Sequence, residues 1–158
     1  MTNMHAMTGM VGERGQRLAF LGIQAEGRLE GLLLRMTLRQ RYQNNSRRNL
    51  ETVYTFPIAH GATLLGLSVE LGGKRLHGRV IGAPAARERY EEAIESGDSP
   101  VMVEQTAAGL YTANLGNLLP GETATVELEY AQLLRFSQGT VRLVVPTVIA
   151  ERYGDAHA

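Results

Sequence analysis

One stretch of the sequence, residues 84–97, has the pattern of an amphipathic helix, whereas the rest alternates in the manner of strands. It begins with Pro84, which suits a first helical turn, and it ends with Gly97, which suits the left-handed position after a last turn. Apolar residues recur in it with a helical period, so one side is apolar and the other is charged. A single amphipathic helix among strands must lie on a sheet to bury its apolar side. The sequence therefore predicts a β domain carrying one helix, with Tyr90 at the centre of the buried side.

The remainder of the sequence reads as short strands separated by turns. Residues 32–42 are the clearest case, because apolar and polar side chains alternate there and Gln40 is the polar exception on the apolar side. Gly72 and Gly73 predict a tight hairpin, since both can take a positive φ. The predicted strands are residues 32–42, 50–56, 65–71, 76–80, 101–105, 110–117, 125–130 and 141–145. This pattern predicts a mainly β fold, an antiparallel β-sandwich of about eight strands with one amphipathic helix packed on it.

Aromatic residues at inward strand positions are expected to anchor the core. They are Tyr42, Tyr54, Phe56 and Tyr130, and Tyr90 has the same role on the helix. No internal repeat or linker divides the chain, so one domain is expected. Residues 1–26 are expected to be a disordered N-terminal tail or a leading strand, residues 27–153 the β-sandwich domain, and residues 154–158 a C-terminal tail.

The composition is typical of a soluble globular domain, because 44% apolar and 20% charged residues exclude a disordered chain. Cysteine is absent, which excludes disulfides and thiolate metal sites and favours a reducing compartment. No apolar run is long enough for a signal peptide or a membrane span. A cytoplasmic location without membrane contact is therefore the expectation.

Charge is balanced overall but uneven along the chain. Residues 28–48 hold six Arg and one Glu, whereas residues 84–130 hold two Arg, eight Glu and one Asp. These runs form either two solvated faces or complementary patches that dock a partner or another copy. The patch residues predicted for the second case are Arg35, Arg39, Arg41, Glu91 and Glu95.

The charge pattern also indicates which kinds of partner the chain is expected to bind. Nucleic acid is not expected, because the basic run lacks interleaved aromatic residues and the domain is not basic overall. Residues 110–117 carry no charge, and they lie within the acidic part of the chain. Because strand edges can pair with another chain, we expect weak self-association, by edge pairing or by exchange of a terminal strand.

Several motifs follow one another in a specific order. LRQRYQNNSRRNLETVYTFPI (38–58) contains a strand, a turn and a Y-x-F-P strand, and GGKRLHGRVI (72–81) is a hairpin. PAARERYEEAIESG (84–97) has an A-x-x-x-Y-x-x-A helix pattern. LPGETATVELEYAQLLRF (119–136) and VPTVIAERY (145–153) complete the set. Together they resemble the VIT domain, the vault protein and inter-α-trypsin module, over residues 27–153.

The resemblance implies a β-sandwich with a helix that acts as an interaction or structural module, commonly placed before a von Willebrand A domain. That neighbouring domain holds a metal through Asp-x-Ser-x-Ser, a motif this sequence lacks, since Asp98-Ser99-Pro100 has no second Ser. The resemblance thus implies a non-catalytic protein–protein interaction module cut from a larger protein. A protein partner or the downstream domain is its expected partner.

Signatures of catalysis are absent from the sequence. It has no Gly-x-Ser-x-Gly elbow, no phosphate-binding Gly-x-x-x-x-Gly-Lys and no His-Glu-x-x-His. The four histidines are far apart in sequence, so no catalytic, cofactor-binding or metal residues are expected. The alternative is a β-sandwich that binds a ligand such as a carbohydrate. The lack of Trp and the inward positions of most aromatic residues favour the interaction module.

Overall fold

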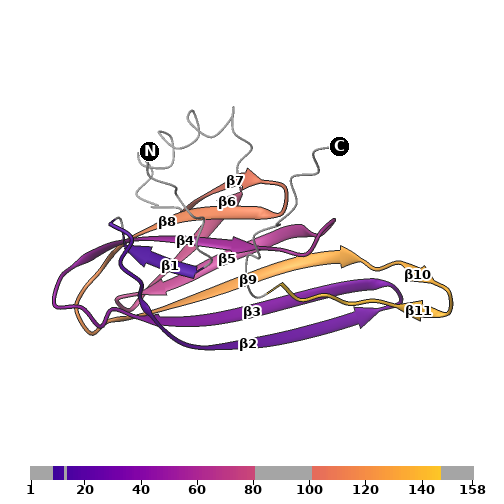
Figure 1. Cartoon of the computed structure of the whole chain (residues 1–158), viewed down its shortest axis with the longest axis horizontal. Helices are drawn as coiled ribbons and strands as arrows, with labels where there is room; N and C mark the ends of the chain where they lie inside the picture. Colours follow the sequence, from indigo (N-terminus) through magenta and orange to yellow (C-terminus); the bar gives the residue numbers. More distant parts are fainter. Residues whose placement is uncertain (1–8, 13, 81–100, 147–158) are drawn as a thin grey trace, which may run out of the picture.

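The structure, a computed structural model of the chain, describes residues 9–12, 14–80 and 101–146 (Figure 1). All regular secondary structure in these ranges is β-strand. In chain order the strands are β1 (Gly9–Gly12), β2 (Ala19–Glu30), β3 (Leu33–Gln43), β4 (Leu50–Pro57), β5 (Thr63–Leu71), β6 (Lys74–Val80), β7 (Val101–Ala107), β8 (Leu110–Leu118), β9 (Thr123–Leu133), β10 (Phe136–Ser137) and β11 (Thr140–Val141). No helix in the described ranges has the length and apolarity to cross a membrane.

Nine of these strands form one sheet, in the order β1-β4-β8-β7-β6-β5-β9-β3-β2. Its neighbours pair antiparallel except β6 and β7, which are parallel, while β10 and β11 form a separate hairpin. The predicted antiparallel sandwich with a helix packed on it is therefore wrong, because the described strands of the domain join in a single mixed sheet. The described residues contain no helix, and the segment predicted to be helical, residues 84–97, lies outside them.

The sheet is strongly curled, so that it closes on its own inner face. Tyr42 of β3 and Tyr54 of β4 have ring centroids 6.0 Å apart, although β8, β7, β6, β5 and β9 lie between these strands in the sheet order. Figure 1 shows β1 and β4 lying across from β9 and β3. Register shifts between β4 and β8 and between β5 and β9 are irregularities of the kind that bend a sheet. A half-barrel results, with the core inside the curl.

Aromatic side chains fill the inside of the curl. Tyr42, Tyr54, Phe56 and Tyr130, four of the predicted anchors, are each buried on the inner face. Phe56 stacks between two rings, with centroids 5.1 Å from Tyr54 and 5.6 Å from Tyr111. The fifth predicted anchor, Tyr90, lies outside the described residues.

Gln40, the polar residue on the apolar side of β3, is buried and acts as the acceptor for two tyrosines. Its Oε1 accepts hydrogen bonds from the hydroxyl of Tyr42 at 2.6 Å and from that of Tyr54 at 2.9 Å. Two phenolic O–H groups in an apolar core need an acceptor, because an unpaired buried hydroxyl costs free energy. The amide of Gln40 thus links β3 to β4 across the curl.

We expect Gln40→Leu to lower the free energy of unfolding by about 2 kcal/mol, because both buried hydroxyls lose their acceptor. Urea denaturation measures this change. The double variant Gln40→Leu, Tyr54→Phe should cost less than the sum of its single changes, since one orphaned hydroxyl is gone. Strict additivity of the two changes in unfolding free energy would show that the hydrogen bond between Tyr54 and Gln40 contributes nothing to stability.

Two predicted turns have the expected chemistry. Gly72 and Gly73 have φ angles of 55° and 75° in the β5–β6 hairpin, where a side chain would be strained. After β3, the buried Asn44 accepts from the backbone N–H and the hydroxyl of Ser46 and donates to the carbonyls of Arg48 and Leu118. Asn44 therefore has a partner for each of its side-chain polar atoms.

Strand positions agree with the sequence prediction in the middle of the chain and differ at its ends. Strands β3 to β9 cover the predicted strand segments from residue 33 to residue 130, so only residue 32 of these segments lies outside a strand. Strands β1 and β2 were not predicted as separate strands, and the segment 141–145 is strand only in β11. The uncharged segment 110–117 lies in β8, which is hydrogen-bonded to β4 and β7. It therefore offers no edge, and the sheet ends at β1 and β2.

Candidate interaction face of the sheet

The outer side of the curl carries a set of charged side chains from four neighbouring strands. Alternation along β3 turns Leu38 and Gln40 inward and Arg39 and Arg41 outward. The register places Arg39 beside Glu127 of β9. We call this surface the charged face, and its residues on β3, β9, β5 and β6 are Arg35, Arg39, Arg41, Thr125, Glu127, Glu129, Ser68, Glu70, Arg75 and His77.

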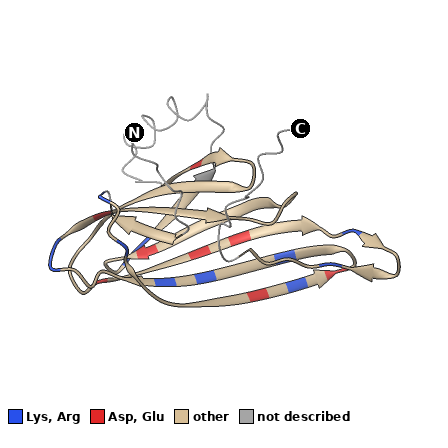
Figure 2. Cartoon of the chain, in the orientation of Figure 1, with Lys and Arg blue, Asp and Glu red and all other residues tan. Residues whose placement is uncertain are grey.

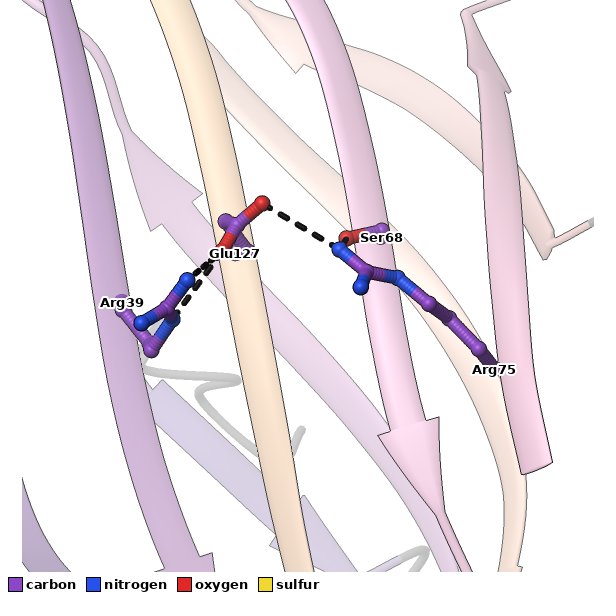
Figure 3. A network of polar contacts seen from close by, with 4 residues as sticks. All are labelled: Arg39, Ser68, Arg75 and Glu127. Carbon is purple, nitrogen blue, oxygen red and sulfur yellow. Dashed lines mark hydrogen bonds and ion pairs between the residues drawn. The ribbon is translucent and has the colours of Figure 1, made fainter. Parts of the chain in front are cut away.

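Glu127 is the centre of a polar network on this face (Figure 3). Its Oε2 accepts from Nε of Arg39 at 3.0 Å and also from Nη2 of the same guanidinium, so this ion pair is bidentate from the arginine side. Its Oε1 lies 3.4 Å from Nη2 of Arg75, which also donates to the hydroxyl of Ser68 at 3.2 Å. The Glu127 side chain is 18% exposed, against 50% and 59% for the two arginines. One half-buried carboxylate therefore holds two more exposed guanidinium groups in place.

The charges of this face are arranged in rows of opposite sign. Figure 2 shows basic residues along β3 and acidic residues along the adjacent β9. The predicted basic run and the C-terminal part of the predicted acidic run thus meet within one molecule, at Arg39 and Glu127. The two predicted acidic patch residues, Glu91 and Glu95, lie outside the described residues.

Sequence reasoning selected the arginines of β3 but missed Glu127, Arg75 and Ser68. Alternation did place Glu127 on the polar side of its strand. Nothing in the sequence, however, revealed that a residue 88 positions from Arg39 would be its cross-strand neighbour. Arg35 and Arg41 are exposed and, by the alternation along β3, lie on the same face as Arg39 in the basic row.

Shallow grooves cross the charged face. One of about 230 Å³ lies between Arg41, Glu70 and Thr125, and one of about 210 Å³ lies beside His77 and Glu129. Both are smaller than the ~300–1,000 Å³ usual for small-molecule sites. A third groove, of about 380 Å³, is lined by charged residues of β2, β3 and β9.

The described residues show neither a grouped metal-ligand set nor an aromatic platform. No group of three or more His, Asp or Glu side chains in these ranges is placed to hold a metal ion. Among the described aromatic residues, the rings of Tyr42, Tyr54, Phe56, Tyr111 and Tyr130 are buried. Phe20 and Phe136 are exposed, one on β2 and the other on β10. The charged face itself therefore offers ionic and hydrogen-bonding groups rather than stacking surfaces.

Comparison with known proteins relates the sequence of this chain to a family. The family model described as "Vault protein inter-alpha-trypsin domain" (VIT) matches residues 20–130, more than half of the chain. Human "von Willebrand factor A domain-containing protein 5A" is 30% identical over 115 residues, which is 71% of this chain and 15% of that protein. A protein of Dictyostelium discoideum, "von Willebrand factor A domain-containing protein DDB_G0285975", is 34% identical over 89 residues, 56% of this chain and 10% of that protein.

A relative with another name shares the same region. Mouse "Protein mono-ADP-ribosyltransferase PARP4" is 24% identical over 128 residues, which is 81% of this chain and 6% of that protein. In each of these three comparisons the chain spans less than a sixth of the relative's length. The similarity therefore concerns one domain of much longer proteins.

Proposed function

Because this chain belongs to the VIT domain family, we propose that it is a non-catalytic protein–protein interaction module that docks a partner through its charged face. A von Willebrand A domain is the first partner to consider, since the names of several similar proteins include that domain. The observation that carries the proposal is the network in which Glu127 holds Arg39 and Arg75 on an open, ordered surface. No second function is proposed.

The geometry of the network supports docking of a protein surface. Holding long arginine side chains in advance reduces the conformational entropy that they would lose on binding. Rows of opposite charge favour one orientation of a partner with the complementary rows, and they repel other orientations. The grooves beside the network are shallow and have charged side chains in their linings, which suits contact with side chains of another protein better than enclosure of a small molecule.

The test begins with the gene that encodes this chain. An open reading frame that joins this sequence to one with an Asp-x-Ser-x-Ser motif supplies the candidate A domain, which is then titrated with the chain. We expect Arg41→Glu to weaken binding about tenfold at low salt, because it reverses one charge of the basic row. Arg47→Glu, the same change on the exposed loop after β3, is the matched control and should bind as the parent chain does.

Binding should also weaken as salt is raised, because exposed charges are screened. Equal affinities for the parent chain and Arg41→Glu would contradict docking through the charged face. No binding by the parent chain at about 1 mM would contradict the A domain as partner.

A further inference from the structure

The edge strand β2 is long and open to pairing. It is hydrogen-bonded to β3 on one side, and the described residues place no strand on its other side. Native edges are commonly shielded by Pro, by Lys, by bulges or by short length. β2 has twelve residues without Pro or Lys, and its register shift lies between Phe20 and Gly22, at its beginning. Among the described residues, the outward backbone donors and acceptors of the regular part, residues 22–30, therefore have no strand partner, and the charged side chains of Glu26, Arg28 and Glu30 are its remaining shield.

The two faces of β2 differ in character. Register with β3 puts Ile23, Ala25, Gly27 and Leu29 on the inner side, opposite Gln40, Leu38, Met36 and Leu34 respectively. Ile23 and Leu29 are 41% and 55% exposed, whereas their neighbours on β3 are buried. At Gly27 the sulfur of Met36 occupies the space that a Cβ would fill. The apolar inner surface thus continues past β3 and ends uncovered at β2.

The outer side of β2 carries Gln24, Glu26, Arg28 and Glu30, and the order of its charges selects one way of pairing. In an antiparallel pair of two β2 strands centred on Gly27, Glu26 of each copy lies opposite Arg28 of the other. A shift of the centre to residue 26 or 28 puts Glu26 opposite Glu26, or Arg28 opposite Arg28. Directly opposed like charges are destabilising in a sheet, and opposite charges are stabilising.

Arg28 is available for such a contact. Within one chain its Nε lies 2.9 Å from Oε1 of Glu30, in a pair whose side chains are 79% and 65% exposed. An exposed pair of this kind contributes little to stability. The remaining guanidinium nitrogens of Arg28 can therefore bind Glu26 of a second copy.

From this pattern we infer that β2 is a self-association edge, which pairs antiparallel with β2 of a second copy about a two-fold axis at Gly27. The pairing joins two sheets into one, places the uncovered apolar inner surfaces side by side, and brings Leu29 of each copy opposite Ala25 of the other. The occupant is a second copy because the strand's own charge order is self-complementary. This edge borders the charged face, because Arg28 is the cross-strand neighbour of Arg35. The two proposals still have separate tests, since one is measured as binding of an A domain and the other as self-association of the chain alone.

Sedimentation equilibrium of the 158-residue chain from about 0.01 to about 1 mM tests the inference. We expect a weak dimer with a dissociation constant on the order of 0.1 mM, because one strand pair buries less than the roughly 1,600 Å² of a standard interface. Glu26→Arg and Arg28→Glu should each weaken the dimer about tenfold or more, since each change sets like charges opposite each other twice. Arg47→Glu is the control for net charge and should dimerise as the parent chain does.

Mixing the two weakened variants gives the sharpest result. Each variant alone should form only a weakened homodimer. Pairing of Glu26→Arg with Arg28→Glu restores both opposite-charge contacts, so the mixture should form a heterodimer about as tight as the parent dimer. The double variant Glu26→Arg, Arg28→Glu should likewise recover self-association. A parent chain that stays monomeric would overturn the inference. A dimer that is indifferent to these charges, or a mixture that shows no recovery, would also overturn it.

Discussion

Replacing Phe56 by alanine is expected to lower the free energy of unfolding by about 3–5 kcal/mol, the range for removing a large ring from a packed core. Phe56 is 1% exposed and lies between the rings of Tyr54 and Tyr111. Its loss opens a cavity and ends two stacked contacts at once. Urea or thermal denaturation followed by circular dichroism measures the change.

The matched control is Phe136→Ala, which is the same chemical change at a position that is 65% exposed. A surface substitution of this kind is expected to change stability by about 0.5 kcal/mol or less. Similar losses for the two variants would show that the aromatic stack is not the centre of the core.

Alkaline pH is expected to unfold this chain through its buried tyrosines. Burial raises the pKa of Tyr42 to about 12, raises the pKa of Tyr54 well above its ordinary value of 10.0, and raises that of Tyr130. Below the unfolded pKa both states keep the phenolic protons, so the stabilising contribution is fully present. Above it the unfolded chain releases protons that the folded chain still holds, and stability falls as pH rises through the window from about 10 to about 12.

The free energy of unfolding is expected to fall by about 1.4 kcal/mol per pH unit through Tyr54 alone, and Tyr42 and Tyr130 act in the same direction. Urea midpoints measured across this window give the slope. Tyr54→Phe should make the slope shallower by about 1.4 kcal/mol per pH unit. Equal slopes for the parent chain and Tyr54→Phe would contradict the prediction.

Much of the local structure followed from the sequence, because alternation depends only on neighbouring residues. A strand turns successive side chains to opposite faces, so the pattern of residues 32–42 identified both the buried tyrosine and the exposed arginines of β3. Gly72-Gly73 predicted a hairpin for a similarly local reason, since few other residues accept a positive φ there. The resemblance to the VIT family was confirmed by the family match over residues 20–130.

The sandwich prediction failed because alternation says nothing about which strands pair. One curled sheet and two stacked sheets need the same inward and outward residues. The parallel pairing of β6 with β7 was missed, although residues 81–100 between them are numerous enough for the crossover that parallel strands require. Strand β2 was left mostly within a tail or leading strand, although Ile23, Ala25, Gly27 and Leu29 alternate in it with polar residues.

The sequence by itself determined where most strands lie, which side of each faces the core, and to which family the chain belongs. Only the tertiary structure decided that Glu127 would hold Arg39 and Arg75, that β8 would be interior, and that β2 would be an edge. The physical reason is that backbone hydrogen-bonding groups are alike in every strand. The choice of partner and register therefore depends on how the whole sheet curls to bury its inner face.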